Sequence, residues 1–267
     1  MAAGARSSLL ITYTTWKALF LRAAVNSLAT GRAAWFWLIA EPIMHIVLLM
    51  VVFSILRVRT IGGISTAIWI MAGLLAFFMF RRTAAQSMSA LKGSKSLFAF
   101  PQIRPADMVL VRAGLEGFLM VIVTIVLLVG AWLYGMAVIP VDPLAVIEAL
   151  FGLWLFGIGY AMTGAVAVEL LPPLGNFLGF LLRPLYFLSG VLFPITLIPY
   201  PYRDWLLLNP LVHGLESTRL GFAPYYHVMP EISIAYLYGW ALVAVFFGLA
   251  LQVRYAKRLA LKNDRRR

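Results

Sequence analysis

The sequence predicts an all-α integral membrane protein with six transmembrane helices, and three observations support this class. First, 63% of the 267 residues are hydrophobic, whereas soluble domains have about 45–50%. Second, only 12% are charged, about half of the usual share. Third, the apolar residues fall into six segments, and about 20 apolar residues suffice for a helix to cross a bilayer. A soluble core of this size would not bury so much apolar surface.

The six predicted spans are separated by short joins in which proline recurs. Proline breaks helices, so its positions support these boundaries. The spans are Ala34–Leu56, Ile64–Phe80, Met108–Leu133, Leu144–Val168, Gly175–Ile198 and Ile232–Val253. We therefore expect one membrane domain over residues 34–256, preceded by a segment at 1–33 and followed by a basic tail at 257–267.

Two further segments are helical in pattern but do not resemble spans. Near the N-terminus, apolar residues recur on one helical face, at Leu9, Tyr13, Trp16 and Phe20. This pattern predicts an amphipathic helix lying in the membrane interface, although packing against protein would produce the same pattern. The segment from 199 to 222 is too polar to span and too apolar for a free loop. It predicts a re-entrant or interfacial helix pair before the last span.

The distribution of charge predicts the orientation of the chain. The formal net charge is +12, with 22 Lys and Arg residues. With six spans and the N-terminus inside, 17 of these residues fall in cytoplasmic segments and four in outer loops. This asymmetry predicts that both termini are cytoplasmic. Because the basic residues flank apolar spans, the charge indicates orientation and not nucleic-acid binding.

The chain offers little for an enzyme to use. No cysteine is present, which excludes disulfides and thiolate metal sites. Gly93-Ser94-Lys95-Ser96 lacks the glycine spacing and the Gly-Lys pair of a phosphate-binding loop. The three histidines, His45, His213 and His227, form no pattern with metal-ligand spacing. We therefore expect no catalytic residue, no metal and no cofactor in this chain.

Ionisable residues inside the predicted spans are candidates for a substrate pathway. Glu41 and His45 lie one helical turn apart in the first span, and Arg183 lies well inside the fifth. An arginine at the centre of a bilayer costs about 2.5–3.5 kcal/mol on insertion scales. Arg183 is therefore expected either to line a water-filled path or to pair with Glu41 or Glu116 in a structural contact.

Aromatic residues accompany these charges. Phe180, Arg183 and Phe187 recur on one helical face, beside Tyr186. Aromatic faces stack on the apolar faces of sugar rings, and an arginine beside them holds an anionic group. Trp35 and Trp37 in the first span complete the predicted pathway. Ordinary packing of bulky side chains in lipid remains the alternative reading of these aromatics.

A polar stripe on the short helix before the last span consists of His213, Glu216 and Arg219, at i, i+3 and i+6. Residues at this spacing share one helical face. The stripe could contact a ligand on the outer side of the membrane. We favour internal salt bridging, because a carboxylate and a guanidinium on the same face can pair directly.

Two stretches resemble a known family. The segment from Gly31 to Pro42 (GRAAWFWLIAEP) and the segment from Arg183 to Phe222 resemble type-two ABC transporter permeases of polysaccharide export, most closely those for capsule. The resemblance implies a homodimer in the bacterial inner membrane with two separate ABC ATPase subunits, which bind ATP and Mg²⁺. It also implies a lipid-linked, usually anionic glycan as substrate, and periplasmic co-polymerase-type and outer-membrane export partners.

The resemblance further implies that the basic loop between spans 2 and 3 couples the chain to its ATPase. The matching stretch is roughly Lys92–Arg104, with apolar side chains at its centre between charged residues. The residues expected to make this contact are Lys92, Lys95, Leu97, Phe98, Phe100 and Arg104. Buried apolar anchors carry most interface energy, although Phe98 and Phe100 could instead enter the lipid interface.

The sequence therefore predicts the permease subunit of an exporter of capsular polysaccharide. An O-antigen or teichoic-acid exporter of the same class is the first alternative. A membrane-embedded enzyme acting on lipid-linked sugars, or a passive structural subunit, would belong to a different class.

Overall fold

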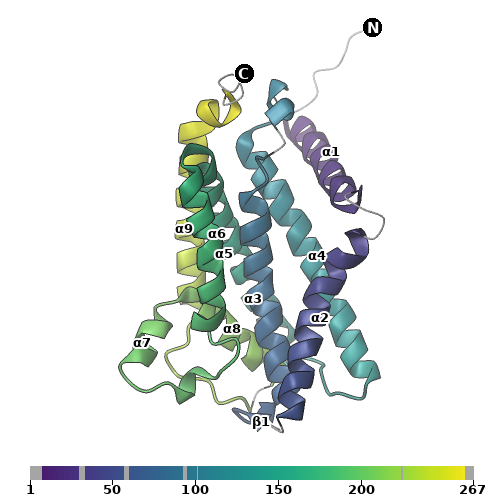
Figure 1. Cartoon of the computed structure of the whole chain (residues 1–267), viewed down its shortest axis with the longest axis vertical. Coiled ribbons are helices and arrows are strands. Elements are labelled where there is room, and N and C mark those ends of the chain that lie inside the picture. The colour runs from purple at the N-terminus through teal and green to yellow at the C-terminus, as the bar shows by residue number, and fades with distance from the viewer. Residues whose placement is uncertain are drawn as a thin grey trace.

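The structure is a computed structural model, and it describes residues 8–29, 34–56, 60–92, 95–100, 102–223 and 225–261. In this part of the chain it is a bundle of long helices with shorter helices at one end (Figure 1). The long helices are α1 (Ser8–Ala29), α2 (Ala34–Ile55), α3 (Thr66–Met88), α4 (Pro105–Leu133), α5 (Pro143–Leu170), α6 (Pro172–Leu188) and α9 (Ile234–Leu261). The shorter elements are η1 (Lys95–Ala99), η2 (Ile195–Leu197), α7 (Tyr202–Leu207), α8 (Pro210–Phe222) and the paired strands β1 (Thr60–Ile61) and β2 (Ile64–Ser65).

Five of the described helices are long and apolar enough to cross a membrane: α2, α3, α4, α5 and α9. These five coincide with five of the six predicted spans, so the all-α membrane class is confirmed. The remaining predicted span, the fifth in chain order, corresponds to α6, which has 17 residues. A helix of that length rises about 25 Å, somewhat less than the roughly 30 Å thickness of a bilayer's hydrocarbon core.

The fifth span was predicted to run to Ile198, and the helix ends ten residues earlier, at Leu188. Gly190 has a φ of 67°, a left-handed conformation that glycine adopts without a Cβ clash. The chain then turns through η2, which packs Ile195 against Val212 and Met229. The apolar residues after Leu188 therefore form a folded turn, because hydropathy alone does not reveal where the backbone leaves the helix.

The centre of the bundle is α3. In the most apolar stretch of 18 residues in α3, 78% of the residues are buried. In the corresponding stretches of α2 and α9, 17% are buried. It lies between α6 and α2 in Figure 1 and packs against α4, α5 and α8. The second span was predicted to end at Phe80, but α3 continues through Arg81 and Arg82 to Met88. These two arginines therefore lie within a helix and not in a cytoplasmic loop.

Helix α1 lies beside α4 at the end of the bundle where α9 also ends (Figure 1). The expected apolar stripe only partly describes its packed face. Leu19 is buried with Val111 of α4 and Leu97 of η1, and Phe20 meets the Phe118 ring edge-on. Tyr13 is 65% exposed, and the side chain of Leu9 lies outside the described residues.

The two helices expected before the last span are present, at the opposite end of the bundle from α1 (Figure 1). Helix α8 packs against α3, α5 and α9 and buries ten of its 13 residues, whereas α7 buries none. At the same end, Gly62 and Gly63 turn the β1–β2 hairpin with positive φ, and His227 donates its backbone N–H to the Gly62 carbonyl at 3.0 Å. The α7–α8 pair is therefore asymmetric, because α8 belongs to the core and α7 does not.

Candidate functional site

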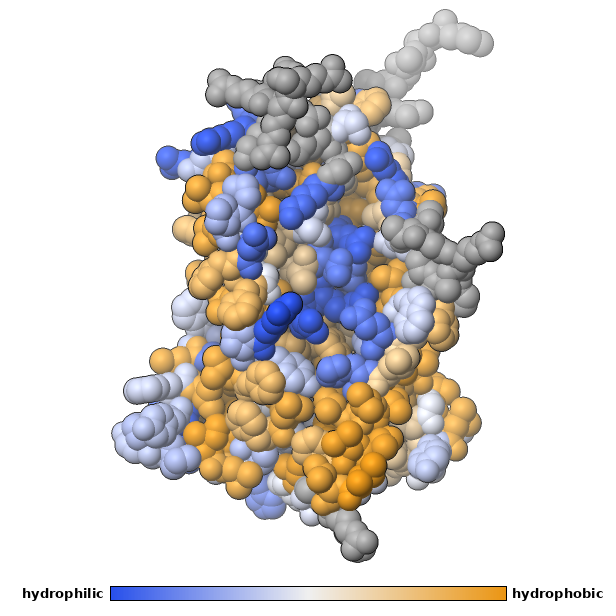
Figure 2. All heavy atoms as spheres, in the orientation of Figure 1, coloured by the Kyte–Doolittle hydropathy of each residue, from blue (hydrophilic) through white to orange (hydrophobic). Residues whose placement is uncertain are grey.

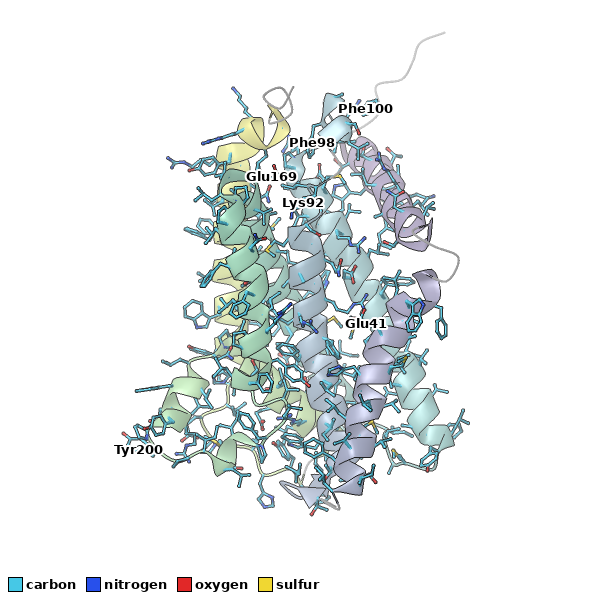
Figure 3. All side chains as sticks on the ribbon, in the orientation of Figure 1. Glu41, Lys92, Phe98, Phe100, Glu169 and Tyr200 are labelled. Atoms are coloured by element: carbon cyan, nitrogen blue, oxygen red, sulfur yellow. The ribbon has the colours of Figure 1, made fainter. Side chains whose placement is uncertain are left out.

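A groove of about 800 Å³ runs along the face between α2 and α3. Its lining combines charged, polar and aromatic side chains, among them Trp37, Glu41, His45, Phe78, Arg81 and Arg82. Figure 2 shows hydrophilic side chains gathered in a hollow at the middle of this face, with hydrophobic surface below. Glu41 lies on α2 at mid-height in Figure 3. Three of the predicted pathway residues, Trp37, Glu41 and His45, therefore line a real groove together with two arginines of α3.

One hydrogen bond joins α2 to α6 beside this groove. His45 Nε2 lies 3.2 Å from the hydroxyl of Tyr186. The His45 ring also meets Phe78 edge-on at 5.3 Å, and the Tyr186 ring meets Phe77 in the same way at 5.2 Å. The predicted residues His45 and Tyr186 thus come from distant parts of the sequence and are in direct contact.

The remaining predicted residues of α6 are exposed, and the Phe187 ring meets the Tyr186 ring edge-on at 5.3 Å. Phe180 and Phe187 are 61% and 55% exposed, and Arg183 is also exposed. No ion pair of Arg183 occurs among the described residues, so its expected pairing with Glu41 or Glu116 is not found. Trp37 is 55% exposed and lines the groove, while the side chain of Trp35 lies outside the described residues.

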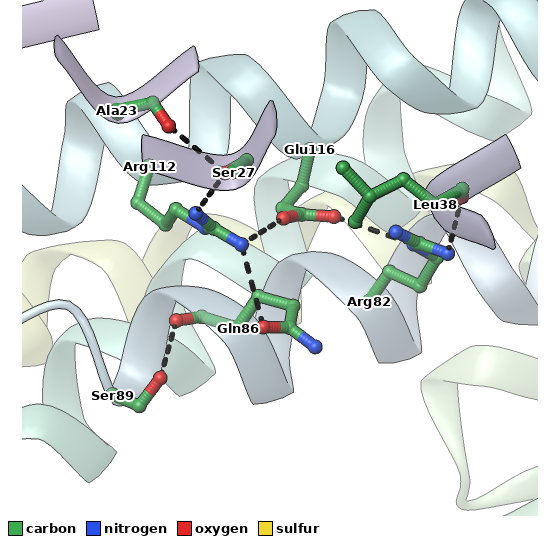
Figure 4. A network of polar contacts seen from close by, with 8 residues as sticks. All are labelled: Ala23, Ser27, Leu38, Arg82, Gln86, Ser89, Arg112 and Glu116. Atoms are coloured by element: carbon green, nitrogen blue, oxygen red, sulfur yellow. Dashed lines mark hydrogen bonds and ion pairs between the residues drawn. The ribbon is translucent and has the colours of Figure 1, made fainter. Parts of the chain in front are cut away.

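Glu116 is fully buried and pairs with two arginines instead (Figure 4). Its carboxylate lies 3.3 Å from Arg82 Nε of α3 and 2.8 Å from Arg112 Nη2, one turn earlier in α4. Arg82 also donates to the Leu38 carbonyl at 3.0 Å, and Arg112 donates to Ser27 Oγ at 2.8 Å. Through these two arginines, the Glu116 carboxylate connects the end of α1 and the start of α2 to α3 and α4.

The sequence reasoning missed the roles of Arg82 and Arg112. Both were counted as loop charges that set the orientation, because they flank apolar segments. A buried charge requires a partner, and Glu116 is the acid in this region that can supply one. The signal available in the sequence was the i, i+4 spacing of Arg112 and Glu116, which places them on one helical face.

At the other end of the bundle, Glu216 and Arg219 of the predicted polar stripe form a buried ion pair of 2.7 Å. Arg219 is fully buried. Its guanidinium lies over the Trp69 ring and donates to the carbonyls of Trp69, Gly190 and Val191. The stripe is therefore turned into the protein, where it holds α8 against α3 and the turn after α6.

Tyr226 completes this network. Its hydroxyl donates to Glu216 Oε2 at 2.7 Å and accepts from Trp69 Nε1 at 3.1 Å. Burial and the neighbouring carboxylate raise the pKa of Tyr226 above its usual range, so the phenol keeps the proton that it donates.

His213, the third member of the stripe, belongs to a separate contact. Its Nδ1 accepts the Ser233 backbone N–H at 3.0 Å, so Nε2 carries the proton and donates to the Leu207 carbonyl at 2.8 Å. Both ring nitrogens are thus used to join α8 to α7 and to the start of α9. No member of the stripe is placed to contact a ligand.

The predicted coupling loop forms the short helix η1 beside α1, and its apolar residues differ in exposure (Figure 3). Leu97 is buried under α1. Phe98 is half-buried against the cluster that includes Leu259 of α9. Phe100 is 56% exposed. Of these three side chains, Phe100 is therefore the one available to act as an apolar anchor for a partner.

The charged residues of this loop are placed as follows. Lys92 is exposed, and the side chain of Lys95 lies outside the described residues. Arg104 immediately precedes α4, and its backbone N–H donates to Asp107 Oδ2 at 2.8 Å. Asp107 also accepts from Trp16 Nε1 of α1 at 3.0 Å. The loop is thus fastened to α1, so a force on one reaches the other.

Comparison with known proteins identifies the class. Residues 14–223 match the ABC-2 type transporter family, so the chain belongs to this family, as the sequence resemblance implied.

Among individual proteins, the chain is 33% identical to the polysialic acid transport protein KpsM of Escherichia coli, over 92% of this chain and 95% of that one. It is 22% identical to the capsule polysaccharide export inner-membrane protein CtrC of Neisseria meningitidis, over 94% of each. It is also 22% identical to the capsule polysaccharide export inner-membrane protein BexB of Haemophilus influenzae, over 94% of this chain and 95% of that one.

Proposed function

We propose that this chain is the membrane permease of an ATP-driven exporter, and that it moves a lipid-linked, anionic capsular polysaccharide across the bacterial inner membrane. The observation that carries the proposal is the groove between α2 and α3, where Arg81 and Arg82 face Glu41 and His45. Charged groups at membrane depth are tolerated where they line a water-filled cavity. The capsule-export names of three relatives support the choice of substrate.

The groove suits a long anionic chain. Arg82 is paired with Glu116, but Arg81 takes part in no ion pair among the described residues, so its guanidinium is available to a negatively charged group. Trp37 and Phe78 add aromatic faces on which sugar rings can stack. Arg183, Phe180 and Phe187 extend this chemistry along α6 on an exposed surface. In a homodimer, a second copy would face such a surface and close it into a path.

The membrane arrangement completes the proposal. Helix α6 is the fifth of the six spans and is shorter than the others, because the chain turns at Gly190 directly after it. Helix α1 lies in the cytoplasmic interface, both termini are cytoplasmic, and α7 and α8 form the helix pair on the outer side. The basic residues near α1, η1 and the end of α9 support this orientation.

ATP hydrolysis belongs to two separate ABC ATPase subunits, which bind ATP and Mg²⁺ and press on the loop at Lys92–Arg104. The exposed Phe100 beside α1 supports this contact. Periplasmic co-polymerase-type and outer-membrane export proteins carry the glycan onward. Export of O-antigen or teichoic acid would use the same groove, and identification of the retained glycolipid separates these substrates.

The proposal is tested by purifying the chain with its ATPase from cells that make the glycan, and by measuring surface polysaccharide. Arg183→Ala is expected to leave the complex assembled but to reduce export about tenfold or more, and Arg183→Lys to retain more export. Arg254→Ala, at an exposed position of α9, is the matched control and should export normally. Normal export by Arg183→Ala in a complex that assembles normally would overturn the role of α6 in the path.

A further inference from the structure

A second polar pocket lies at the end of the bundle where α1 packs, separate from the groove. It measures about 260 Å³ and lies between α1 and the ends of α3 and α4. Its lining includes three cations, Arg22, Lys92 and Arg112, together with the uncharged polar residues Asn26, Gln86 and Ser89. No acidic residue lines it. A pocket with this lining attracts an anion.

Two of the three cations of the pocket have no acidic partner within the described part of the chain. Arg22 and Lys92 are exposed and take part in no ion pair there. Arg112 pairs with Glu116, but Glu116 also pairs with Arg82, so this cluster keeps a net positive charge (Figure 4). Asp107, the other acid of α4, is engaged by Trp16 and by the Arg104 backbone.

The position of Arg22 is unusual for an amphipathic helix. The residues of α1 that line the pocket, Leu19, Arg22, Ala23 and Asn26, recur at i, i+3, i+4 and i+7 and so share one face. This face is turned toward α3 and α4, and Leu19 at its start is buried. Arg22 on this face is nevertheless exposed and takes part in no ion pair among the described residues, so its guanidinium is available to a bound group.

We propose that this pocket binds the phosphodiester headgroup of an anionic lipid. In the orientation proposed above, α1 lies at the level of the headgroups on the cytoplasmic side. Basic pockets between membrane helices on that side bind anionic headgroups. The guanidinium groups of Arg22 and Arg112 and the ammonium group of Lys92 would donate to the phosphate oxygens. The lipid would come from the bulk membrane or would be the anchor of the exported glycan.

The pocket would also connect the groove to the predicted coupling loop. Gln86 lines both this pocket and the groove, and it accepts from Arg112 Nη2 at 3.4 Å. Lys92 begins the coupling loop. Arg22 belongs to α1, which packs over this loop. A bound headgroup would therefore hold α1, the loop and α3 together. The pocket is tested with an added phospholipid and not with the glycan, so the proposed site can fail independently of the proposed export function.

The test is native mass spectrometry of the assembled complex with its ATPase, in detergent, with two added lipids that differ only in headgroup. Dioleoylphosphatidylglycerol is expected to bind in preference to dioleoylphosphatidylcholine. Arg22→Gln combined with Lys92→Gln should weaken phosphatidylglycerol binding about 30-fold, since each basic residue near an anionic surface contributes about fivefold. Lys17→Gln, an exposed cation of α1 outside the pocket, is the matched control and should bind as the wild type does.

Equal binding of both lipids, or full selectivity in the double variant, would overturn the proposal. Loss of selectivity only when the ATPase is present would also overturn it, because the pocket would then be a protein interface. The complex purified from cells that do not make the glycan distinguishes the sources. Retention of phosphatidylglycerol in these cells identifies a membrane lipid, and an anionic adduct found only in glycan-producing cells identifies the substrate anchor; both support the site.

Discussion

The guanidinium carbon of Arg219 lies 3.6 Å from the centre of the Trp69 ring. A cation this close to an indole face is attracted by the ring quadrupole, and the attraction grows when both groups are desolvated. Arg219 is also paired with Glu216 of the same helix. This buried ion pair packs α8 against the central helix α3 through Trp69. This contact stabilises the end of the bundle opposite α1.

Gly73 provides the space for this arrangement. A Cβ on Gly73 would collide with the Arg219 guanidinium, which its ion pair and carbonyl contacts hold in place. Gly73→Ala is therefore expected to destabilise the chain by about 1–3 kcal/mol, as overpacked cores generally do. Thermal unfolding in detergent measures this change. Gly114→Ala is the control, because a Cβ there meets no neighbour within 4 Å, and it should be neutral or stabilising. Equal stability of the two variants would contradict the fixed position of Arg219.

The His45–Tyr186 contact predicts a measurable coupling between α2 and α6. Tyr186→Phe keeps the ring against Phe77 but removes the hydroxyl, so we expect a loss of about 0.5–1.5 kcal/mol. A double-mutant cycle with His45→Leu, read by thermal unfolding, should show that the two losses are not additive. Additive losses would mean that the hydrogen bond does not join the two helices in solution.

Phe100 is expected to be the anchor of the ATPase contact. Phe100→Asp should reduce copurification of the ATPase while leaving the thermal stability of the chain nearly unchanged, because the side chain is 56% exposed. Phe98→Asp should instead destabilise the chain, since Phe98 packs against the cluster at the end of α9. Tyr225→Asp is the control, as it changes an exposed aromatic at the opposite end. Normal ATPase binding by Phe100→Asp would move the coupling contact elsewhere.

The proposed orientation can be read directly, because the chain contains no native cysteine. A cysteine at Tyr225, which is 82% exposed, should react with an impermeant thiol reagent in intact cells. A cysteine at Lys257, exposed near the end of α9, should react only after the cells are permeabilised. The reverse labelling pattern would refute cytoplasmic termini.

The sequence by itself determined the membrane class, the family and five of the spanning helices. Long apolar segments report where helices cross a bilayer, because each backbone polar group there must bond within its own helix. The sequence also placed Glu41 and His45 on one face, since helical spacing is a local property. The polar stripe of α8 was recognised as a set for the same reason.

Only the tertiary structure decided how these groups are used. It buried Arg219 over Trp69 and paired Glu116 with Arg82 and Arg112, while Arg183 stayed exposed. It also ended α6 at Leu188, although the apolar sequence continues. Whether a charge faces a partner, a groove or lipid depends on which helices lie beside it. Hydropathy and spacing describe one helix at a time and carry no information about its neighbours.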